Sequence, residues 1–450
     1  MSNPDWESIL APATWQQSLS TPLCGNPKID PPERRDQQPR NLAPWPASSA
    51  DIFFPGFGLT RPSGPDGVER MSYGAKKTVW ILGAGFSRPL GGPLLYDLLS
   101  HKGRMQARAR FGDAFAHDTA IVYTVFEDGH RTDSQLWQHA EEFLEVVDLA
   151  RDRDPAEMSD HRTATSRLLL EMIHKRDGTM TIRRFRDLTL KTIAAECSFD
   201  RWIDPNAEAW DPYLEWAEML NEKDTVITFN YDTVIERLPL QLGSSGRTTG
   251  LGQDSLMRPG DGACISNMTA VLKLHGSLQW GVSTTGSENN PYTFGDGYWD
   301  DFSTTGEYEP LIGMPGSTKS LFRKKHFNKI WGHAKRRIAE EADVIVFFGY
   351  RFPPSDAQSR SEILAAIKKN RANYLRIHIV LGPDVNHPDT LRLAKMLEVT
   401  LQGAGRIPVE ELAHTSSAGP KPAHYVVIKQ PLYVQDFMTI LDERFLNGTH

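Results

Sequence analysis

The alternation of apolar and polar positions along the chain predicts an α/β protein. Five short runs are β-branched or apolar on both sides of the alternation, which is typical of strands covered on both faces of a sheet. Stretches with the 3.6-residue spacing of apolar positions that indicates helices lie between several of them. The predicted strands are Val79–Leu82, Thr225–Phe229, Ala270–Leu274, Val344–Phe348 and Leu375–Leu381.

The stretch between the first two predicted strands is too long for a simple crossover. Residues from about 100 to 222 show helical spacing at 136–150, 163–175 and 207–220. A crossover between parallel strands usually needs a single helix. We therefore predict, within residues 71–450, a doubly wound, Rossmann-like parallel sheet with an inserted helical subdomain.

Residues 1–70 differ in kind from the rest of the chain. Twelve of the 30 prolines lie there, and no periodicity is present. Proline fixes φ and removes a hydrogen-bond donor, so we expect a poorly ordered N-terminal arm. Aromatic residues such as Trp45 and Phe57 leave open an arm that docks on a neighbouring subunit. The favoured alternative is a loose tail, since chain termini are commonly loose, with Met71 as a possible true start.

Composition narrows the function classes. The net charge of −7 and the apolar and charged fractions of 39% and 24% are those of an ordinary globular protein. The negative net charge argues against general binding to nucleic acid or to a membrane surface. Three scattered cysteines, Cys24, Cys197 and Cys264, form no C-x-x-C pair, and the first residues lack the pattern of a signal peptide. We expect a cytoplasmic chain that holds no zinc.

A glycine turn directly follows the first predicted strand. It contains Gly83, Ala84 and Gly85, then Ser87, and a second glycine pair with Pro93 comes shortly after. A buried strand that feeds such a turn brings backbone N–H groups close to a ligand, as in nucleotide-binding α/β folds. Arg88 stands where the dehydrogenase pattern G-x-G-x-x-G has its third glycine, so hydride transfer is disfavoured.

Polar residues and glycines end the next three strands. Asn230 and Asp232 follow the second strand, His275 the third and Gly349 the fourth. Each has an ordinary structural explanation alone, because Asn, Asp and Gly form turns and a single His is commonly structural. The carboxyl ends of parallel strands share one edge of the sheet, where α/β proteins keep their sites. Together these residues therefore predict a site.

In this order, the four motifs resemble those of the sirtuin family and its prokaryotic NAD-hydrolase branch. The resemblance covers Met71 to about Leu381, interrupted by the helical insertion. The motifs read Gly83-Ala84-Gly85-Phe86-Ser87 with Gly91-Gly92-Pro93, then Thr228-Phe229-Asn230-Tyr231-Asp232, Leu274-His275-Gly276-Ser277, and Phe348-Gly349-Tyr350.

The resemblance implies that NAD, as the substrate, binds in a cleft at the carboxyl ends of the strands. Asn230 would hold the ribose region or the attacking water, and His275 would act as general base on a ribose hydroxyl or on water. Asp232 would bind the amide group of the nicotinamide. Gly83, Ala84, Gly85 and Ser87 would lie against the pyrophosphate, and Gly349 would let the backbone approach the phosphates. Pro93 is the remaining residue expected to bind the cofactor.

The sequence differs from the pattern of the protein-deacylating sirtuins at several positions, and these differences bear on the reaction that we expect. The two C-x-x-C pairs of the zinc module are missing, and Leu94-Leu95-Tyr96 follows the G-x-P segment where Phe-Arg is usual. Tyr350 and Arg351 stand where deacylases usually have Thr-Ser. These differences favour NAD cleavage over protein deacylation.

The first hypothesis is an NAD hydrolase that releases nicotinamide and ADP-ribose. In the branch that the chain resembles, such enzymes deplete NAD in antiphage defence. The resemblance implies a homo-oligomer, with a partner ATPase or a phage-derived trigger. One alternative is an NAD-dependent protein deacylase or ADP-ribosyltransferase. Another is a non-catalytic sensor that binds NAD or ADP-ribose and recruits a partner.

Overall fold

The computed structural model describes residues 76–131, 136–151, 161–252, 255–258, 267–283, 292–293, 308–313, 325–353, 356–412 and 423–441. All of them belong to one compact unit, Met71–His450. The predicted N-terminal arm, residues 1–70, lies outside the described residues. In the part of the chain that is described, no helix has the length and apolar character that crossing a membrane requires.

A seven-stranded parallel sheet forms the centre of the fold. The strand order is β3-β2-β1-β7-β8-β10-β9, and it reverses between β1 and β7, as in doubly wound Rossmann-like folds. The five predicted strands are confirmed, and β10 and β9 extend the sheet at one edge. The strands are β1 (Thr78–Leu82), β2 (Thr225–Thr228), β3 (Ala270–Lys273), β7 (Val344–Phe348), β8 (Tyr374–Val380), β9 (Ile407–Pro408) and β10 (His424–Gln430).

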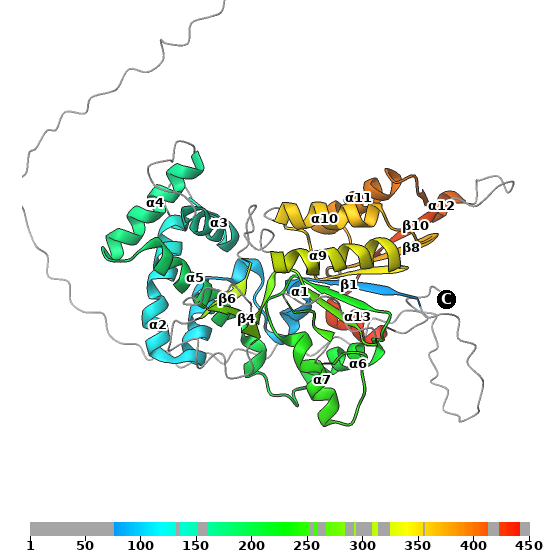
Figure 1. Ribbon diagram of the computed structural model, residues 1–450, viewed down its shortest axis with the longest axis horizontal. Helices are drawn as coiled ribbons and strands as arrows, with labels where there is room; N and C mark the ends of the chain where they lie inside the picture. The colour runs from blue at the N-terminus through cyan, green and yellow to red at the C-terminus, as the bar shows by residue number, and fades with distance from the viewer. Residues whose placement is uncertain are drawn as a thin grey trace, which may run out of the picture. The chain divides into compact units, whose positions relative to one another are not determined.

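Alternate residues of β1 enter two separate cores, one on each face of the sheet. Val79 and Ile81 pack with the helices of one face, whereas Trp80 and Leu82 pack with those of the other. Figure 1 shows the two sets of helices on opposite sides of the sheet. The first set is α9 (Lys325–Arg336), α10 (Ala357–Lys368) and α11 (Pro388–Gln402), and the second is α6 (Asp211–Met219), α7 (Val234–Ser244) and α13 (Val434–Ile440).

The helical insertion follows the first strand, as predicted, but its own core ends earlier than residue 222. Trp137, Phe143 and Phe185 are buried in a core shared by the four helices of this insertion. The helix α6 packs on the sheet instead, where Trp216 meets Trp80 edge to face with ring centroids 5.5 Å apart. The four helices are α2 (His101–Arg131), α3 (Ala140–Arg151), α4 (His161–Arg176) and α5 (Ile182–Cys197).

A small antiparallel sheet follows β3. Its strand order is β5-β4-β6, and β6 contacts α5 of the helical subdomain. A π-helical turn, Arg337–Glu341, continues α9 toward β7. The remaining elements are β4 (Gly276–Ser283), β5 (Tyr292–Thr293), β6 (Tyr308–Ile312), α1 (Ala84–Ser87) and α12 (Val409–Leu412).

A buried carboxyl group joins the helices of the insertion. Glu196, on α5, accepts hydrogen bonds from the Tyr123 hydroxyl at 2.8 Å and from the Leu99 N–H at 3.0 Å. Burial raises the pKa of Glu196 from 4.5 to about 8. The folded chain therefore holds a proton that the unfolded chain releases near pH 4.5, and the resulting stability is lost as the pH rises from about 4.5 to about 8.

We expect Glu196→Gln to flatten this pH dependence. One titrating group changes the free energy of unfolding by at most about 1.4 kcal/mol per pH unit. Urea unfolding at pH 5, 6 and 7 measures the slope. Glu171→Gln, at an exposed position of α4, is the control and should leave the slope unchanged. Equal slopes for Glu196→Gln and the unaltered chain would refute the prediction.

Candidate active site

One cavity collects the residues that the four motifs single out. It has a volume of about 790 Å³ and opens where the parallel strands end. The structure thus confirms that segments far apart in the sequence meet there, although the role of each residue stays a prediction. The predicted residues that line it are Gly83, Ala84, Gly85, Ser87, Pro93, Asn230, Asp232, His275 and Gly349.

The glycine turn packs against the turn after β7. Gly83 donates its N–H to the Phe348 carbonyl at 3.1 Å, and Gly85 donates to the Gly349 carbonyl at 3.1 Å. A Cβ atom on Gly83 would lie 2.7 Å from the Cα of Tyr350, and one on Gly85 would lie 2.7 Å from the Cα of Gly349. The glycines therefore allow two backbone turns to touch. The expectation that their N–H groups face a ligand is wrong for these two residues, because both donate within the protein.

The side-chain amide of Asn230, in the cavity wall, is held by the glycine turn. Its Nδ2 donates to the Gly83 carbonyl at 3.0 Å and to Ser87 Oγ at 3.3 Å. Its backbone N–H donates to Thr228 Oγ1 at 3.1 Å. Because a carboxamide has two N–H bonds and both have partners, Oδ1 is the atom that it presents to a ligand. That oxygen can accept a hydrogen bond from a hydroxyl group or a water molecule.

Asp232 lies buried beside Asn230 on the same loop. Burial raises its pKa from 3.8 to about 7, while the positive charge of Lys273 and a hydrogen bond with Ser87 act in the opposite direction. Its carboxyl group also accepts the Val234 N–H at 3.3 Å. Near neutral pH the group is therefore both a donor and an acceptor, which suits the two-sided hydrogen bonding of a ligand carboxamide.

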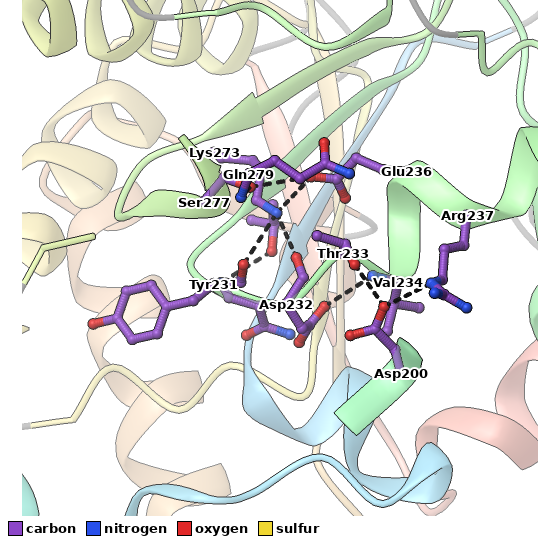
Figure 2. Close-up of polar contacts among 12 residues, drawn as sticks. Asp200, Tyr231, Asp232, Thr233, Val234, Glu236, Arg237, Lys273, Ser277 and Gln279 are labelled. Atoms are coloured by element: carbon purple, nitrogen blue, oxygen red, sulfur yellow. Dashed lines mark hydrogen bonds and ion pairs between the residues drawn. The ribbon is translucent and has the colours of Figure 1, made fainter. Parts of the chain in front are cut away.

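A buried lysine binds the backbone of this loop, as Figure 2 shows. Lys273 is 1% exposed, and its Nζ contacts Glu236 Oε1 at 2.7 Å. The same Nζ donates to the backbone carbonyls of Asp232 and Tyr231. Ser277 Oγ lies 3.4 Å from the same Glu236 oxygen. One cation thus ties β3, the site loop and α7 together.

A second buried carboxylate secures the start of α7. Asp200 accepts a hydrogen bond from Thr233 Oγ1 at 2.6 Å and pairs with Arg237 Nε at 3.0 Å (Figure 2). Burial raises the pKa of Asp200. Thr233 directly follows Asp232, so this contact also limits the movement of the site loop.

We expect Lys273→Met to lower the free energy of unfolding by about 3–5 kcal/mol, because removing one partner leaves a buried carboxylate without its counter-charge. Urea denaturation measures the loss. The matched control is Lys335→Met, which removes an exposed pair with Glu362 at 3.0 Å and should cost less than about 1 kcal/mol. Equal losses for the two variants would contradict the structural role given to Lys273.

His275 lies between an aromatic pair and a carboxyl group. The side chain is 7% exposed. The imidazole meets the Phe229 ring edge to face with ring centroids 4.8 Å apart, and Phe229 stacks on Tyr350 with centroids 4.0 Å apart. Its Nε2 lies 3.2 Å from Ser359 Oγ and 3.5 Å from Asp356 Oδ2. The ring is therefore held from both sides within the cavity wall.

The glycine after His275 has its own structural reason. Gly276 has φ of +88°, and a Cβ there would overlap the Leu311 carbonyl of β6. The His275 carbonyl accepts the Gly313 N–H at 2.7 Å. The His-Gly pair thus marks the sharp change from β3 to the antiparallel sheet, which anchors the histidine backbone.

Three charged side chains of the cavity wall, Arg351, Asp389 and Arg392, were given no role by the sequence analysis. Arg351 and Arg392 both pair with Asp389, at 3.3 and 3.2 Å. Leu381 and Tyr433 line the same region. Two guanidinium groups against one carboxylate leave a net positive charge, which suits a ligand that carries phosphate. The helical subdomain completes the wall with Gln138, His139 and Glu142.

Several site residues escaped the sequence analysis because their partners are distant in the chain. Lys273 lies inside an apolar strand, and Asp356 precedes a helix where an acidic residue commonly serves as a cap. Neither position gives a sequence signal of the contact that it makes. Tyr350 was noted only as a departure from the family pattern. The missed residues are Phe229, Glu236, Lys273, Tyr350, Asp356 and Ser359.

The described part of the chain contains no group of three His, Cys, Asp or Glu side chains that could hold a metal ion. Cys197 is buried and lines the cavity. Cys24 and Cys264 lie outside the described residues.

The similarity of this chain to known proteins is distant. No protein-family model and no curated protein matches this sequence. A solved structure described as "Structural Basis for the Mechanism and Regulation of Sir2 Enzymes" is 14% identical, with a TM-score of 0.30 over 73% of this chain and 92% of its own. The structure of Sir2Tm bound to a propionylated peptide is 12% identical, with a TM-score of 0.28 over 83% and 93%. Likenesses this low say nothing about the reaction of this chain.

Proposed function

We propose that this chain hydrolyses NAD to nicotinamide and ADP-ribose. One observation carries the proposal: all nine residues that the four motifs assign to NAD line a single cavity of about 790 Å³ at the carboxyl ends of the strands. A dinucleotide is elongated and carries two phosphates. The glycine turn and the arginines Arg351 and Arg392 line this cavity together with Asn230 and His275.

The proposed placement puts the nicotinamide riboside beside the loop after β2 and His275. Asp232, with its pKa near 7, would exchange hydrogen bonds with the nicotinamide amide. Asn230 Oδ1 would accept a hydrogen bond from the attacking water, since both N–H bonds of its amide are occupied. The adenosine would extend toward Leu381 and Tyr433.

Hydrolysis breaks the bond between ribose C1′ and the nicotinamide nitrogen, and the bonding electron pair leaves with that nitrogen. Water supplies the oxygen that bonds to C1′. His275 would accept one proton from this water and pass it to solvent, so each turnover releases one proton. The developing charge on the ribose resembles the oxocarbenium ion of glycoside hydrolysis, and nearby polar oxygens stabilise it.

The test is incubation of the full chain with NAD in water enriched in oxygen-18. We expect equal amounts of nicotinamide and ADP-ribose, with the label in ADP-ribose. Nicotinamide release that requires an acylated peptide, or that leaves ADP-ribose on a protein, would instead support the deacylase or transferase alternative. Stoichiometric binding of NAD without cleavage would support the sensor. The cytoplasmic location stays a prediction from the cysteine pattern and the first residues. The oligomer, the partner ATPase or phage-derived trigger and the role in antiphage defence stay predictions of the resemblance.

A further inference from the structure

Asp356 forms a buried hydrogen-bonded cluster with His275. Its carboxyl group is 3% exposed, precedes α10 and lines the cavity. The Ser359 hydroxyl donates to Asp356 Oδ1 at 2.6 Å, and the Tyr350 hydroxyl donates to Oδ2 at 2.6 Å. Oδ2 also lies 3.5 Å from His275 Nε2. Of these residues, the resemblance gives a role only to the histidine.

The hydrogen-bond directions determine the tautomer of the imidazole. The only hydrogen of the Ser359 hydroxyl is given to Asp356, so Ser359 Oγ acts as an acceptor toward His275 Nε2 at 3.2 Å. The carboxylate oxygen on the same side is also an acceptor. Because these two acceptors face Nε2, the proton of the neutral ring lies on Nε2, and the basic lone pair is on Nδ1.

We propose that Asp356 is the positioning residue for His275. It fixes the ring in the tautomer with the proton on Nε2, and its negative charge stabilises the imidazolium that forms when His275 accepts a proton from water. The carboxylate itself stays ionised, so one proton moves and no further reactant is needed. The inference rests on the proposed function for its catalytic meaning, whereas the tautomer and the charge coupling are properties of the chain alone.

Asp356 faces the His275 ring, and the Tyr350 hydroxyl in turn contacts Asp356. A carboxylate within about 4–6 Å of an imidazole raises its pKa by about 1–3 units. Removing the charge of Asp356 should therefore lower the pKa of His275. The other titratable or charged side chains that line the same cavity are Arg88, Tyr96, His139, Glu142, Cys197, Tyr231, Asp232, Arg351, Asp389, Arg392 and Tyr433.

The first test measures the pH dependence of nicotinamide release by Asp356→Asn. We expect kcat to fall by about 10²–10⁴-fold, in the range of general-base contributions, with the KM for NAD changed less than about threefold. The acid limb of kcat/KM should move to lower pH by about one unit. A merely structural residue would lower activity without moving this limb. Ser359→Ala should give a smaller loss, and Asp177→Asn, in an exposed turn, serves as the control.

The second test needs no turnover. Histidine labelled with nitrogen-15 in the full chain reports the pKa and tautomer of each ring, and the spectrum of His275→Gln assigns the signal. We expect the Nε2–H tautomer and a pKa higher than in Asp356→Asn. Equal pKa values, or the Nδ1–H tautomer in the unaltered chain, would overturn the inference. An absence of NAD cleavage would count against the proposed function, while this titration still decides the pairing of Asp356 with His275.

Discussion

Replacement of His275 by alanine is expected to lower nicotinamide release from NAD at least about 100-fold, because the loss of a positioned general base costs 10²–10⁴-fold. The side chain lies in the cavity wall, 4.8 Å from the Phe229 ring. Steady-state release of nicotinamide, with thermal unfolding as the check on folding, measures the effect. His117→Ala removes a histidine whose side chain is 91% exposed and should leave the rate unchanged.

Asn230→Ala gives an independent view of the same site. It removes the proposed acceptor for water together with the bonds to Gly83 and Ser87. We expect a loss similar to that of His275→Ala, because both residues act on the same water. Activity within about threefold of the unaltered chain in either variant would remove that residue from the proposed mechanism.

Gly349→Ala is expected to lower the free energy of unfolding by more than about 3 kcal/mol, as steric overlap with buried backbone and a strained φ add together. Gly349 has φ of +70°, and a Cβ there would lie 2.6 Å from the Cα of Gly85 and overlap the N–H of Phe86. Those atoms belong to the backbone of the glycine turn, so they cannot rotate away. Urea unfolding followed by circular dichroism measures the loss.

The matched control for Gly349 is a second glycine with a positive φ. Gly91 has φ of +91°, but no atom lies within 4 Å of a Cβ built on it. Gly91→Ala should therefore cost only the backbone strain, about 1–2 kcal/mol. If the two substitutions cost the same, close contact between the turns after β1 and β7 is not what requires glycine at position 349.

The sheet could be predicted from the sequence because each strand carries its signal locally. Central strands such as β1 and β7 are buried on both faces, so their runs are continuously apolar. The strand β10, which lies next to the short edge strand β9, is only partly buried and mixes polar with apolar positions, so it lacks that signal. The helix α6 shows ordinary helical spacing, which cannot tell whether Trp216 enters the sheet core or the core of the helical subdomain.

The meeting of the four motifs could also be predicted, because parallel strands end at one edge of the sheet. That geometry brings Asn230 to Gly83, 147 residues away, without any signal from the residues between them. The supporting contacts could not be predicted in this way. His275 and Ser359 are 84 residues apart and meet only because α10 begins beside the end of β3. The backbone N–H groups of Gly83 and Gly85 donate to carbonyls at the end of β7 and in the turn after it. No local sequence pattern reveals that this turn lies beside them.

The central claim is that these four segments form one site in which NAD is held for cleavage. A crystal structure of the His275→Ala chain with NAD tests it most directly, because the variant should bind the dinucleotide without cleaving it. We expect the pyrophosphate against residues 83–87 and the ribose C1′ close enough to Asn230 Oδ1 for a single water, at about 3–3.5 Å from C1′, to lie between them. NAD bound elsewhere, or in this cavity with its nicotinamide toward Tyr433, would contradict the account.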